Sequence, residues 1–203
     1  MHLSSLEKMQ DFRQAFLDGR EAENLTVYDL GSQDVNGSYR QIFNEKAWSY
    51  IGLDMEEGRN VDIVLRNPYD WKEIPANSGD VLISGQAFEH IRFFWLTMLE
   101  IRRVLKPGGL CCIIAPSGGH EHRYPVDCWR FYPDGFEALA AFAGLEVRKI
   151  STQWLPDPRY TEESNEWRDS VLICEKTRRG AVVEFKSRVR DFLLKRFCLP
   201  RLG

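Results

Sequence analysis

The sequence lacks the features that mark secreted, membrane-spanning or nucleic-acid-binding proteins. Its five cysteines are scattered, so their spacing predicts neither a disulfide framework nor a zinc knuckle. No apolar run approaches the roughly 18 residues of a membrane span, and the first residues are too polar for a signal peptide. The net charge of −3 gives no basic excess of the kind that a general nucleic-acid binder carries. We therefore expect a soluble, cytoplasmic protein with a small-molecule substrate and no nucleic-acid partner.

The sequence does contain enough apolar residues for one substantial core. Of its 203 residues, 43% are hydrophobic and 12% are aromatic, which favours one domain with additions over two domains. Hydrophobic residues recur every three or four positions between Leu3 and Phe16, which predicts a helix within residues 1–20, beginning near Ser4 or Ser5. It would pack on the main domain, residues 21–177, or cover its pocket.

A second apolar stripe lies near the end of the chain. Residues 178–203 hold eight basic and only two acidic side chains, and their hydrophobic residues share one helical face. We expect a basic amphipathic helix that packs on its own domain. The alternative is a helix that contacts an anionic membrane surface or another protein.

Strand-like segments alternate with helical ones in the main domain. Helices are predicted at 39–47, 93–105 and 133–143. The alternation predicts an α/β fold with a mostly parallel sheet and helices on both faces. Residues 151–169 contain two prolines and no helical period, so the last strand is expected to run antiparallel. The seven predicted strands are 27–30, 50–53, 61–65, 80–84, 110–115, 145–150 and 170–175.

Two of these strand ends have the pattern of a nucleotide-binding pocket. The strand-forming residues TVYDL lead directly into Gly31, which lets the backbone turn sharply without a side-chain clash. The next strand ends at Asp54, 23 positions after Gly31, where a doubly wound fold places a carboxylate that binds ribose hydroxyls. A nicotinamide-dependent oxidoreductase would share these features, but it would also carry GxGxxG, and GSQDVNG does not match that pattern.

The order of motifs resembles the class I S-adenosylmethionine-dependent methyltransferases between Leu25 and Lys176. VYDLGS is similar to the first motif of that family, YIGLDM to its acidic second strand end, and DVLISGQAFEHI to its fourth-strand segment. EIRRVLKPGGLCCIIAPS resembles the helix, turn and fifth strand that follow, and RRVLKPGG is its most specific part. Two positions depart from the family: Gln33 stands where a second glycine is usual, and Asn67 where an aspartate is usual.

The resemblance implies a doubly wound, Rossmann-like fold with S-adenosylmethionine as the cofactor, held at the strand ends. It places Asp29 or Asp34 at the cofactor's ammonium group and Asp54 at its ribose. Each aspartate could instead only cap a turn or a helix. If the cofactor loop were degenerate, the chain would be a non-catalytic binding module. The implied cofactor-binding residues are Asp29, Gly31, Ser32, Asp34, Asp54, Met55, Asn67, Tyr69, Ser84 and Gly85.

Methyl transfer from a sulfonium mainly requires that two reactants be positioned and water be excluded, so a catalytic side chain is optional. His90 and His122 are the candidate catalytic residues, because a neutral imidazole can accept a proton from a substrate hydroxyl. The alternative is that they only bond backbone groups. The preferred prediction is that the chain has no metal site. A less favoured alternative is a divalent metal held by Gln86, Glu89, His90 and His122.

The glycine- and proline-bounded loop SGGHEHRYPVDCWRFYPDG mixes aromatic, acidic and basic residues. Such a composition suits stacking on a ring while hydrogen-bonding its hydroxyls, so we expect a sugar or phenol-like acceptor that is methylated on oxygen. The aromatic residues could instead anchor the loop in the core. The candidate substrate-binding residues are Gln86, Tyr124, Asp127, Trp129 and Arg130.

Overall fold

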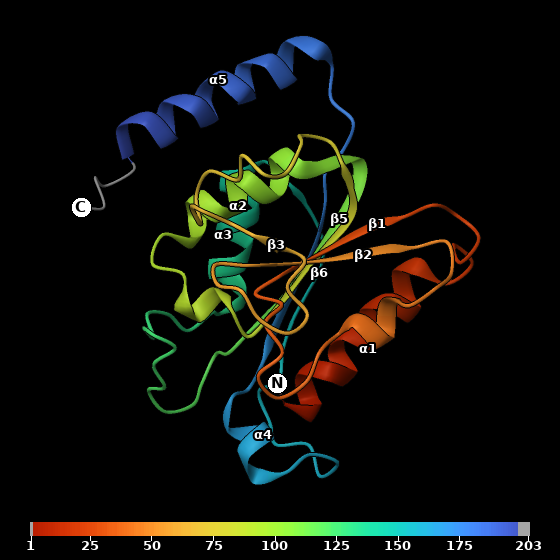
Figure 1. Ribbon diagram of the computed structural model, residues 1–203. Coiled ribbons are helices and arrows are strands. Elements are labelled where there is room, and N and C mark those ends of the chain that lie inside the picture. The colour runs from red at the N-terminus through yellow and green to blue at the C-terminus, as the bar shows by residue number, and fades with distance from the viewer. Residues whose placement is uncertain (1, 199–203) are drawn as a thin grey trace.

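The computed structural model describes residues 2–198 and centres on one sheet (Figure 1). The strands are β1 (Thr26–Leu30), β2 (Ser49–Asp54), β3 (Ile63–Val64), β4 (Gly79–Gly85), β5 (Leu105–Ala115), β6 (Glu146–Thr152) and β7 (Ser170–Glu175). Their order is β3-β2-β1-β4-β5-β7-β6. All pairs from β3 to β5 are parallel, whereas β7 runs antiparallel to both β5 and β6. This confirms the predicted Rossmann-like sheet and its antiparallel last strand.

Helices cover both faces of the sheet, as expected for a buried parallel sheet. The helices are α1 (Leu3–Leu17), α2 (Phe94–Val104), α3 (Pro133–Ala143), α4 (Glu162–Glu166) and α5 (Ala181–Cys198), with short 3-10 helices η1 (Arg40–Phe43) and η2 (Phe88–His90). Figure 1 shows α1 on one side of the sheet and α2 and α3 on the other. Among the residues that the structure describes, no helix is both long and apolar enough to cross a membrane.

Side chains of β5 alternate between two hydrophobic clusters, one on each face. Cys111 and Ile113 belong to the cluster that contains α2 and α3, whereas Cys112 and Ile114 belong to the cluster that contains α1. This alternation follows from the two-residue period of a strand. Because both faces are covered, β5 is buried from Leu110 to its end.

Several predicted boundaries agree with the structure, and α3 matches at both ends. Proline occupies its first position and Gly144 ends it in the left-handed conformation, with a φ of +71°. The predicted helix at 93–105 is observed as α2. The N-terminal helix also forms, but Ser4 and Ser5 lie inside it, buried, rather than at its start.

The predicted helix at 39–47 is wrong, because only the single turn η1 forms there. Phe43 and Trp48 are both buried on the face that α1 covers, and their ring centroids lie 6.2 Å apart. With α1 on this face, the segment needs only one turn to bury its two rings. The predicted third strand shrinks to Ile63–Val64. Residues 151–169 hold the unpredicted helix α4, which Thr161 caps by accepting a hydrogen bond from the Ser164 amide at 3.2 Å.

Candidate functional site

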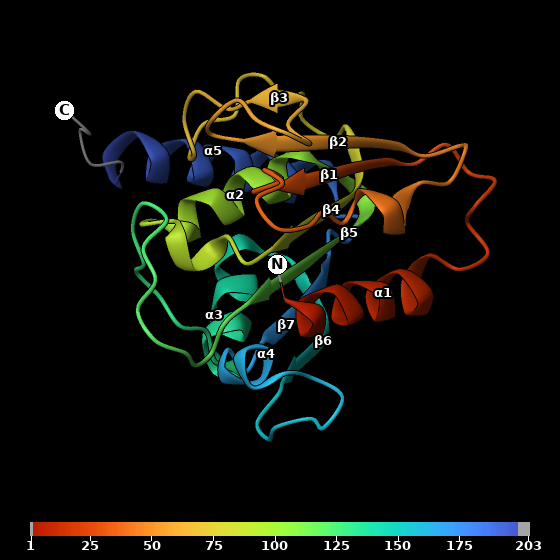
Figure 2. The same ribbon diagram turned by 60° about the horizontal axis from the view of Figure 1, so that its bottom comes forward.

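The carboxyl ends of β1, β2 and β4 lie at the same edge of the sheet. Leu30 pairs with Leu53 of β2 and with Ser84 of β4, so the three strands end at the same level. In Figure 2 the arrowheads of β1 and β2 point in the same direction, toward this edge. In a doubly wound fold, ligands bind in the crevice outside these ends. The structure thus brings the loops that begin at Gly31, Met55 and Gln86 into one region.

The turn after β1 depends on glycine. Gly31 has a φ of +78°, and a Cβ built on it would lie only 2.5 Å from the Cβ of Ala87. Its amide and that of Ser32 both donate to the carbonyl of Leu53, at 2.9 and 3.1 Å. The loops that follow β1 and β4 therefore approach each other closely, and they do so because residue 31 has no side chain.

Asp54 lies at the end of β2 and is only partly buried. One carboxylate oxygen accepts a hydrogen bond from the Gln33 amide at 3.0 Å, and the other accepts from the Met55 amide at 2.7 Å. Each oxygen retains a further lone pair. Asp54 thus fixes two loops, the capping role anticipated from the sequence, and can still accept bonds from a ligand. Met55, 44% exposed, lies next to it.

The other two aspartates differ in environment. Asp29 is 2% exposed, accepts a hydrogen bond from the Tyr50 hydroxyl through one oxygen, and has no partner for the other. Burial raises the pKa of Asp29 to about 7. Asp34 instead pairs with Arg59 at 2.9 Å and accepts from the Gly37 amide at 2.9 Å. Of the two, only Asp29 thus has an unused carboxylate oxygen, whereas Gly37 and Arg59 engage both oxygens of Asp34.

The remaining predicted cofactor residues differ in how far they are buried. Ser84 is fully buried, and its hydroxyl donates to the Leu30 carbonyl at 2.9 Å; Tyr69 is 3% exposed and belongs to the core. Asn67 accepts a hydrogen bond from the Tyr69 amide at 2.8 Å and is partly exposed. A Cβ on Gly85 would lie 2.0 Å from the Tyr39 hydroxyl. The predicted cofactor contacts of these residues stay predictions.

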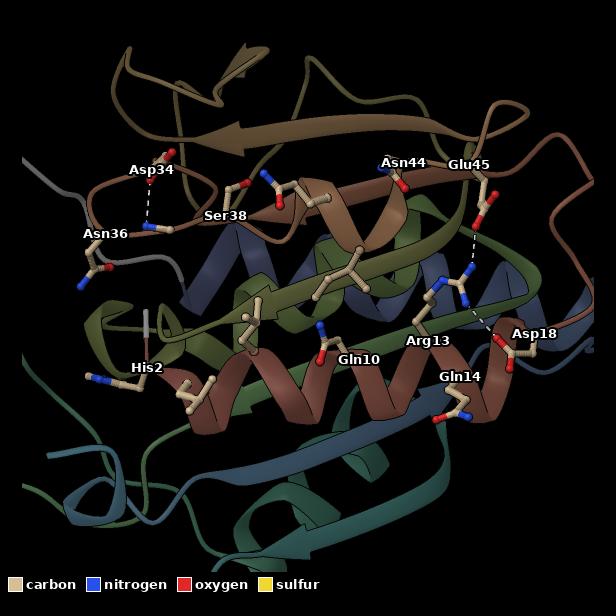
Figure 3. Close-up of a pocket in the computed structure, with 15 residues that line it drawn as sticks. His2, Gln10, Arg13, Gln14, Asp18, Asp34, Asn36, Ser38, Asn44 and Glu45 are labelled. Carbon is tan, nitrogen blue, oxygen red and sulfur yellow. Dashed lines mark hydrogen bonds and ion pairs between the residues drawn. The ribbon is translucent and has the colours of Figure 1, made fainter. Parts of the chain in front are cut away.

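A cavity of about 1000 Å³ lies between α1 and the segment that follows β1 (Figure 3). Polar side chains of α1, among them Gln10 and Arg13, face Ser38 and Asn44 across it. Of the predicted cofactor residues, only Asp34 lines it. A second hollow of about 610 Å³ also contains Asp34 and Ser38 and extends to Asp62. The open space therefore flanks the β1–β2 side of the predicted cofactor edge.

The two predicted catalytic histidines meet beside the end of β4. His90 lies in η2 and His122 in the loop after β5, and their ring centroids are 4.9 Å apart. The Nδ1 atom of His90 lies 2.5 Å from the Val126 carbonyl oxygen. Burial and the nearby His90 lower the pKa of His122. Glu89, fully buried, completes the group, and burial raises its pKa to about 8.

Gln86 directly follows β4, and the other four predicted substrate residues lie on the loop after β5. Asp127 accepts hydrogen bonds from Arg130, at 2.6 and 2.9 Å, and from the His122 amide, at 2.8 Å. The bonds from Arg130 lower the pKa of Asp127. Tyr124 and Trp129 are 59% and 38% exposed. The Trp129 indole donates to the Arg92 carbonyl at 3.2 Å, so this ring both anchors the loop and faces solvent.

Comparison with known proteins identifies this fold and this order of elements. Residues 28–113 match the family described as "Methyltransferase domain". An uncharacterized methyltransferase of Mycolicibacterium gilvum is 27% identical over 118 residues, which are 51% of this chain and 46% of the relative. Residues 28–113 thus match a methyltransferase domain, and the chain has the sheet order of the class I S-adenosylmethionine-dependent methyltransferase fold. It spans about half the length of this curated relative.

Solved structures show the same methyltransferase fold. A 1,6-didemethyltoxoflavin-N1-methyltransferase of Burkholderia thailandensis, with bound S-adenosylhomocysteine, has a TM-score of 0.60 at 15% identity, covering 87% of this chain and 85% of that one. A SAM-dependent methyltransferase of Archaeoglobus fulgidus has a TM-score of 0.59 at 13% identity, covering 85% and 95%. S-adenosylmethionine is the methyl donor of this domain class.

The residues of this methyltransferase domain fit that donor. The unpartnered oxygen of Asp29 is a buried acceptor that an ammonium group would satisfy. Asp54 offers free lone pairs at the position where a ribose is expected. Gly31 has no side chain that would fill the space at the turn after β1, between these two aspartates.

Sequence reasoning missed two residues of the site. Asp169 is fully buried just before β7 and accepts hydrogen bonds from Ser4 and from Gln86, both at 2.8 Å. Trp167, 4% exposed, lies with its ring 4.4 Å from that of His122. The only signal was their place directly ahead of a buried strand, since nothing in their spacing links them to residues 86 or 122.

Proposed function

We propose that the chain is an S-adenosylmethionine-dependent methyltransferase whose acceptor is an oxygen of a sugar or phenol-like small molecule. The observation that supports it best is the pair formed by His90 and His122 beside the predicted cofactor edge. A hydroxyl acceptor must lose its proton as it is methylated, and a neutral imidazole can accept that proton. The lowered pKa of His122 favours its neutral form.

His90 is oriented for the same task. A carbonyl oxygen can only accept a hydrogen bond, so the contact with Val126 places the proton of His90 on Nδ1. Its Nε2 atom is then left with a free lone pair. Asp127 fixes the loop that carries His122 through its contact with the His122 amide.

The donor, when bound, supplies an electrophilic methyl group and a sulfur leaving group. Asp54 would accept hydrogen bonds from its ribose, and Asp29 would meet its ammonium group. Ser32, Asp34, Met55 and Asn67 stay assigned to the same cofactor. The protein's remaining task is to hold the acceptor oxygen in line with the methyl carbon and to exclude water.

The exposed rings of Tyr124 and Trp129 would stack on the acceptor, since aromatic faces bind sugar and phenol rings. A nitrogen acceptor is the second candidate. It is favoured by the similarity to the Burkholderia thailandensis structure, which is named as an N1-methyltransferase.

Calorimetry with S-adenosylmethionine and, separately, with NAD tests the function. We expect saturable heat with the sulfonium donor and none with NAD. Saturable binding of NAD alone would favour an oxidoreductase, and binding of neither would favour a non-catalytic module. Incubation of a cell extract with donor carrying a ¹³C methyl group, followed by mass spectrometry and NMR of the labelled product, then separates an O-methyl from an N-methyl product.

A further inference from the structure

Three side chains with metal-binding chemistry meet next to the end of β4. Glu89, His90 and His122 each offer one ligand atom, and these atoms all lie within 4.8 Å of one another. Two come from η2 and one from the loop after β5, so the fold brings together residues that are 32 positions apart. A carboxylate with two imidazoles is a common ligand set for divalent transition metals.

Glu89 has no other partner that explains its position. It is 0% exposed, and neither of its carboxylate oxygens has a hydrogen-bond partner among the described residues. Burying an unpaired carboxylate is costly unless a proton or a cation neutralises it. The side-chain oxygen of Gln86, three residues earlier, is likewise buried and without a partner, while its amide group donates to Asp169. Glu89 and Gln86 thus both carry buried oxygen acceptors that are unused.

The backbone orients His90 as a ligand. Its Nδ1 proton points at the Val126 carbonyl, which leaves Nε2 free at 3.6 Å from a Glu89 oxygen. Metal-binding histidines typically donate their other ring proton to a carbonyl or carboxylate in this way. Two ligand atoms that share a tetrahedral ion lie roughly 3.4 Å apart when each bond is about 2.1 Å. The observed separation is close to that value.

We propose that Glu89, His90 and His122 bind one divalent transition-metal ion, with the side-chain oxygen of Gln86 as a further ligand. Nitrogen ligands favour ions such as Mn²⁺, Co²⁺ or Zn²⁺ over Mg²⁺ and Ca²⁺, which prefer oxygen. The ion would neutralise Glu89 in place of a proton. If the proposed methyl transfer is correct, on which this last step rests, the ion would also bind the acceptor oxygen and lower its pKa. With the ion bound, the proton of the acceptor hydroxyl would pass to water while the two histidines hold the ion; in the metal-free chain the histidines would accept that proton directly.

Calorimetric titration of the chelator-treated full chain with Zn²⁺ or Mn²⁺ tests the site. We expect one equivalent to bind, and Glu89→Gln and His122→Ala to weaken binding more than about tenfold, the scale on which even outer partners of metal ligands act. His120→Ala is the matched control: it lies in the same loop, but pairs with Glu166 at 3.0 Å and is not one of the three ligands. The His120→Ala variant should bind the metal as tightly as the unaltered chain does.

Glu89→Gln keeps the size of a buried side chain, so its fold is checked by its melting temperature and its affinity for S-adenosylmethionine. Absence of saturable metal binding in the unaltered chain would overturn the proposal, as would equal metal affinity of Glu89→Gln and His120→Ala. A chain that binds the sulfonium donor but no metal refutes only the metal site. One that binds the metal but not the donor supports the site and refutes the proposed methyl transfer.

A second inference rests on α5, whose apolar face points away from the rest of the protein. Figure 1 shows the helix along the outer side of α2. Its inward side is held by ion pairs: Arg102 of α2 donates to Glu184 at 2.8 Å and to Asp191 at 3.2 Å, and Lys195 pairs with Glu100. The helix therefore lies against its own domain through these ion pairs and Leu194, while most of its apolar residues stay exposed. The outward apolar residues are Val182, Val183, Phe185, Val189, Phe192, Leu193 and Phe197, which are 42–76% exposed.

We infer that this face binds an anionic membrane surface. Exposed basic residues, Lys186, Arg190 and Arg196, are interspersed with the exposed rings. A helix with aromatic residues on one face and basic residues beside them inserts its rings at the acyl boundary and pairs its charges with anionic headgroups. Charge complementarity thus selects an anionic lipid surface as the occupant.

Flotation of the full chain with vesicles tests this surface. We expect binding to phosphatidylcholine vesicles that contain one quarter phosphatidylglycerol, little binding to phosphatidylcholine alone, and release at high salt. Phe185→Ser with Phe192→Ser should abolish it, whereas Leu155→Ser, which removes an apolar side chain that is 79% exposed elsewhere, should not. Equal binding to both vesicle types would overturn the inference. So would a dimer that depends on Phe185 and Phe192 and binds no vesicles.

Discussion

Replacement of Gly31 by alanine is expected to destabilise the fold and the cofactor edge together. Two costs are expected. A non-glycine residue at a φ of +78° costs roughly 1–2 kcal/mol. The new methyl would also lie 2.5 Å from the Cβ of Ala87, and such overpacking typically costs about 1–3 kcal/mol. We therefore expect Gly31→Ala to lower the free energy of unfolding by roughly 2–5 kcal/mol, measured by urea titration.

Gly19 supplies the matched control, because it has a φ of +86° but no atom lies within 4 Å of the position that a Cβ would occupy. Gly19→Ala should therefore carry only the backbone cost, about 1–2 kcal/mol. Adding Ala87→Gly to Gly31→Ala should remove the overpacking and recover most of the difference. If Gly31→Ala costs no more than Gly19→Ala, or if Ala87→Gly recovers nothing, the loops after β1 and β4 are not in contact.

Three further changes test other parts of the site. Asp54→Asn should weaken S-adenosylmethionine binding by about 1–3 kcal/mol in calorimetry, since charge-assisted hydrogen bonds to the ribose are lost; unchanged affinity would remove Asp54 from the site. Asp29 binds its proton more tightly in the folded chain than in the unfolded chain. The free energy of unfolding should therefore fall by up to about 1.4 kcal/mol per pH unit as the pH rises from 4 to 7. Asp29→Asn should flatten that slope in urea titrations, and an unaltered slope would contradict the assignment. Arg102→Met removes the ion pairs that join α2 to Glu184 and Asp191, and it should speed hydrogen exchange in α5 but not in β4.

The sheet could be predicted because its signals are local. β1, β4, β5 and β7 are buried on both faces and so read as short apolar runs between glycine-, proline- or charge-rich turns. Pro133 and Gly144 similarly delimit α3. At these positions the propensity of each residue agrees with its tertiary surroundings, and the predicted boundaries are nearly correct, except that β5 begins at Leu105 rather than at Leu110.

The errors arise where tertiary packing decides. The apolar spacing at 39–47 allows a helix, but α1 already covers that face of the sheet. Trp167 reaches His122, and Asp169 reaches Gln86, only through the antiparallel return of β7, so no periodicity could link them to residues 122 or 86. The exposure of the apolar stripe of α5 could not be predicted either, because it depends on Arg102, about 80 residues earlier, which holds the opposite side of the helix.

The beginning of α1 links the two halves of the site. The Ser5 hydroxyl lies 2.6 Å from that of Tyr39, whose ring occupies the space next to Gly85 at the end of β4. One residue earlier, the Ser4 hydroxyl donates to Asp169, which also holds Gln86. His2 stacks on Trp167 with 5.1 Å between the ring centroids, and Trp167 in turn contacts His122. The beginning of α1 thus reaches the predicted cofactor edge through Tyr39 and the histidine cluster through Trp167, so we expect displacement of this helix to change the two together.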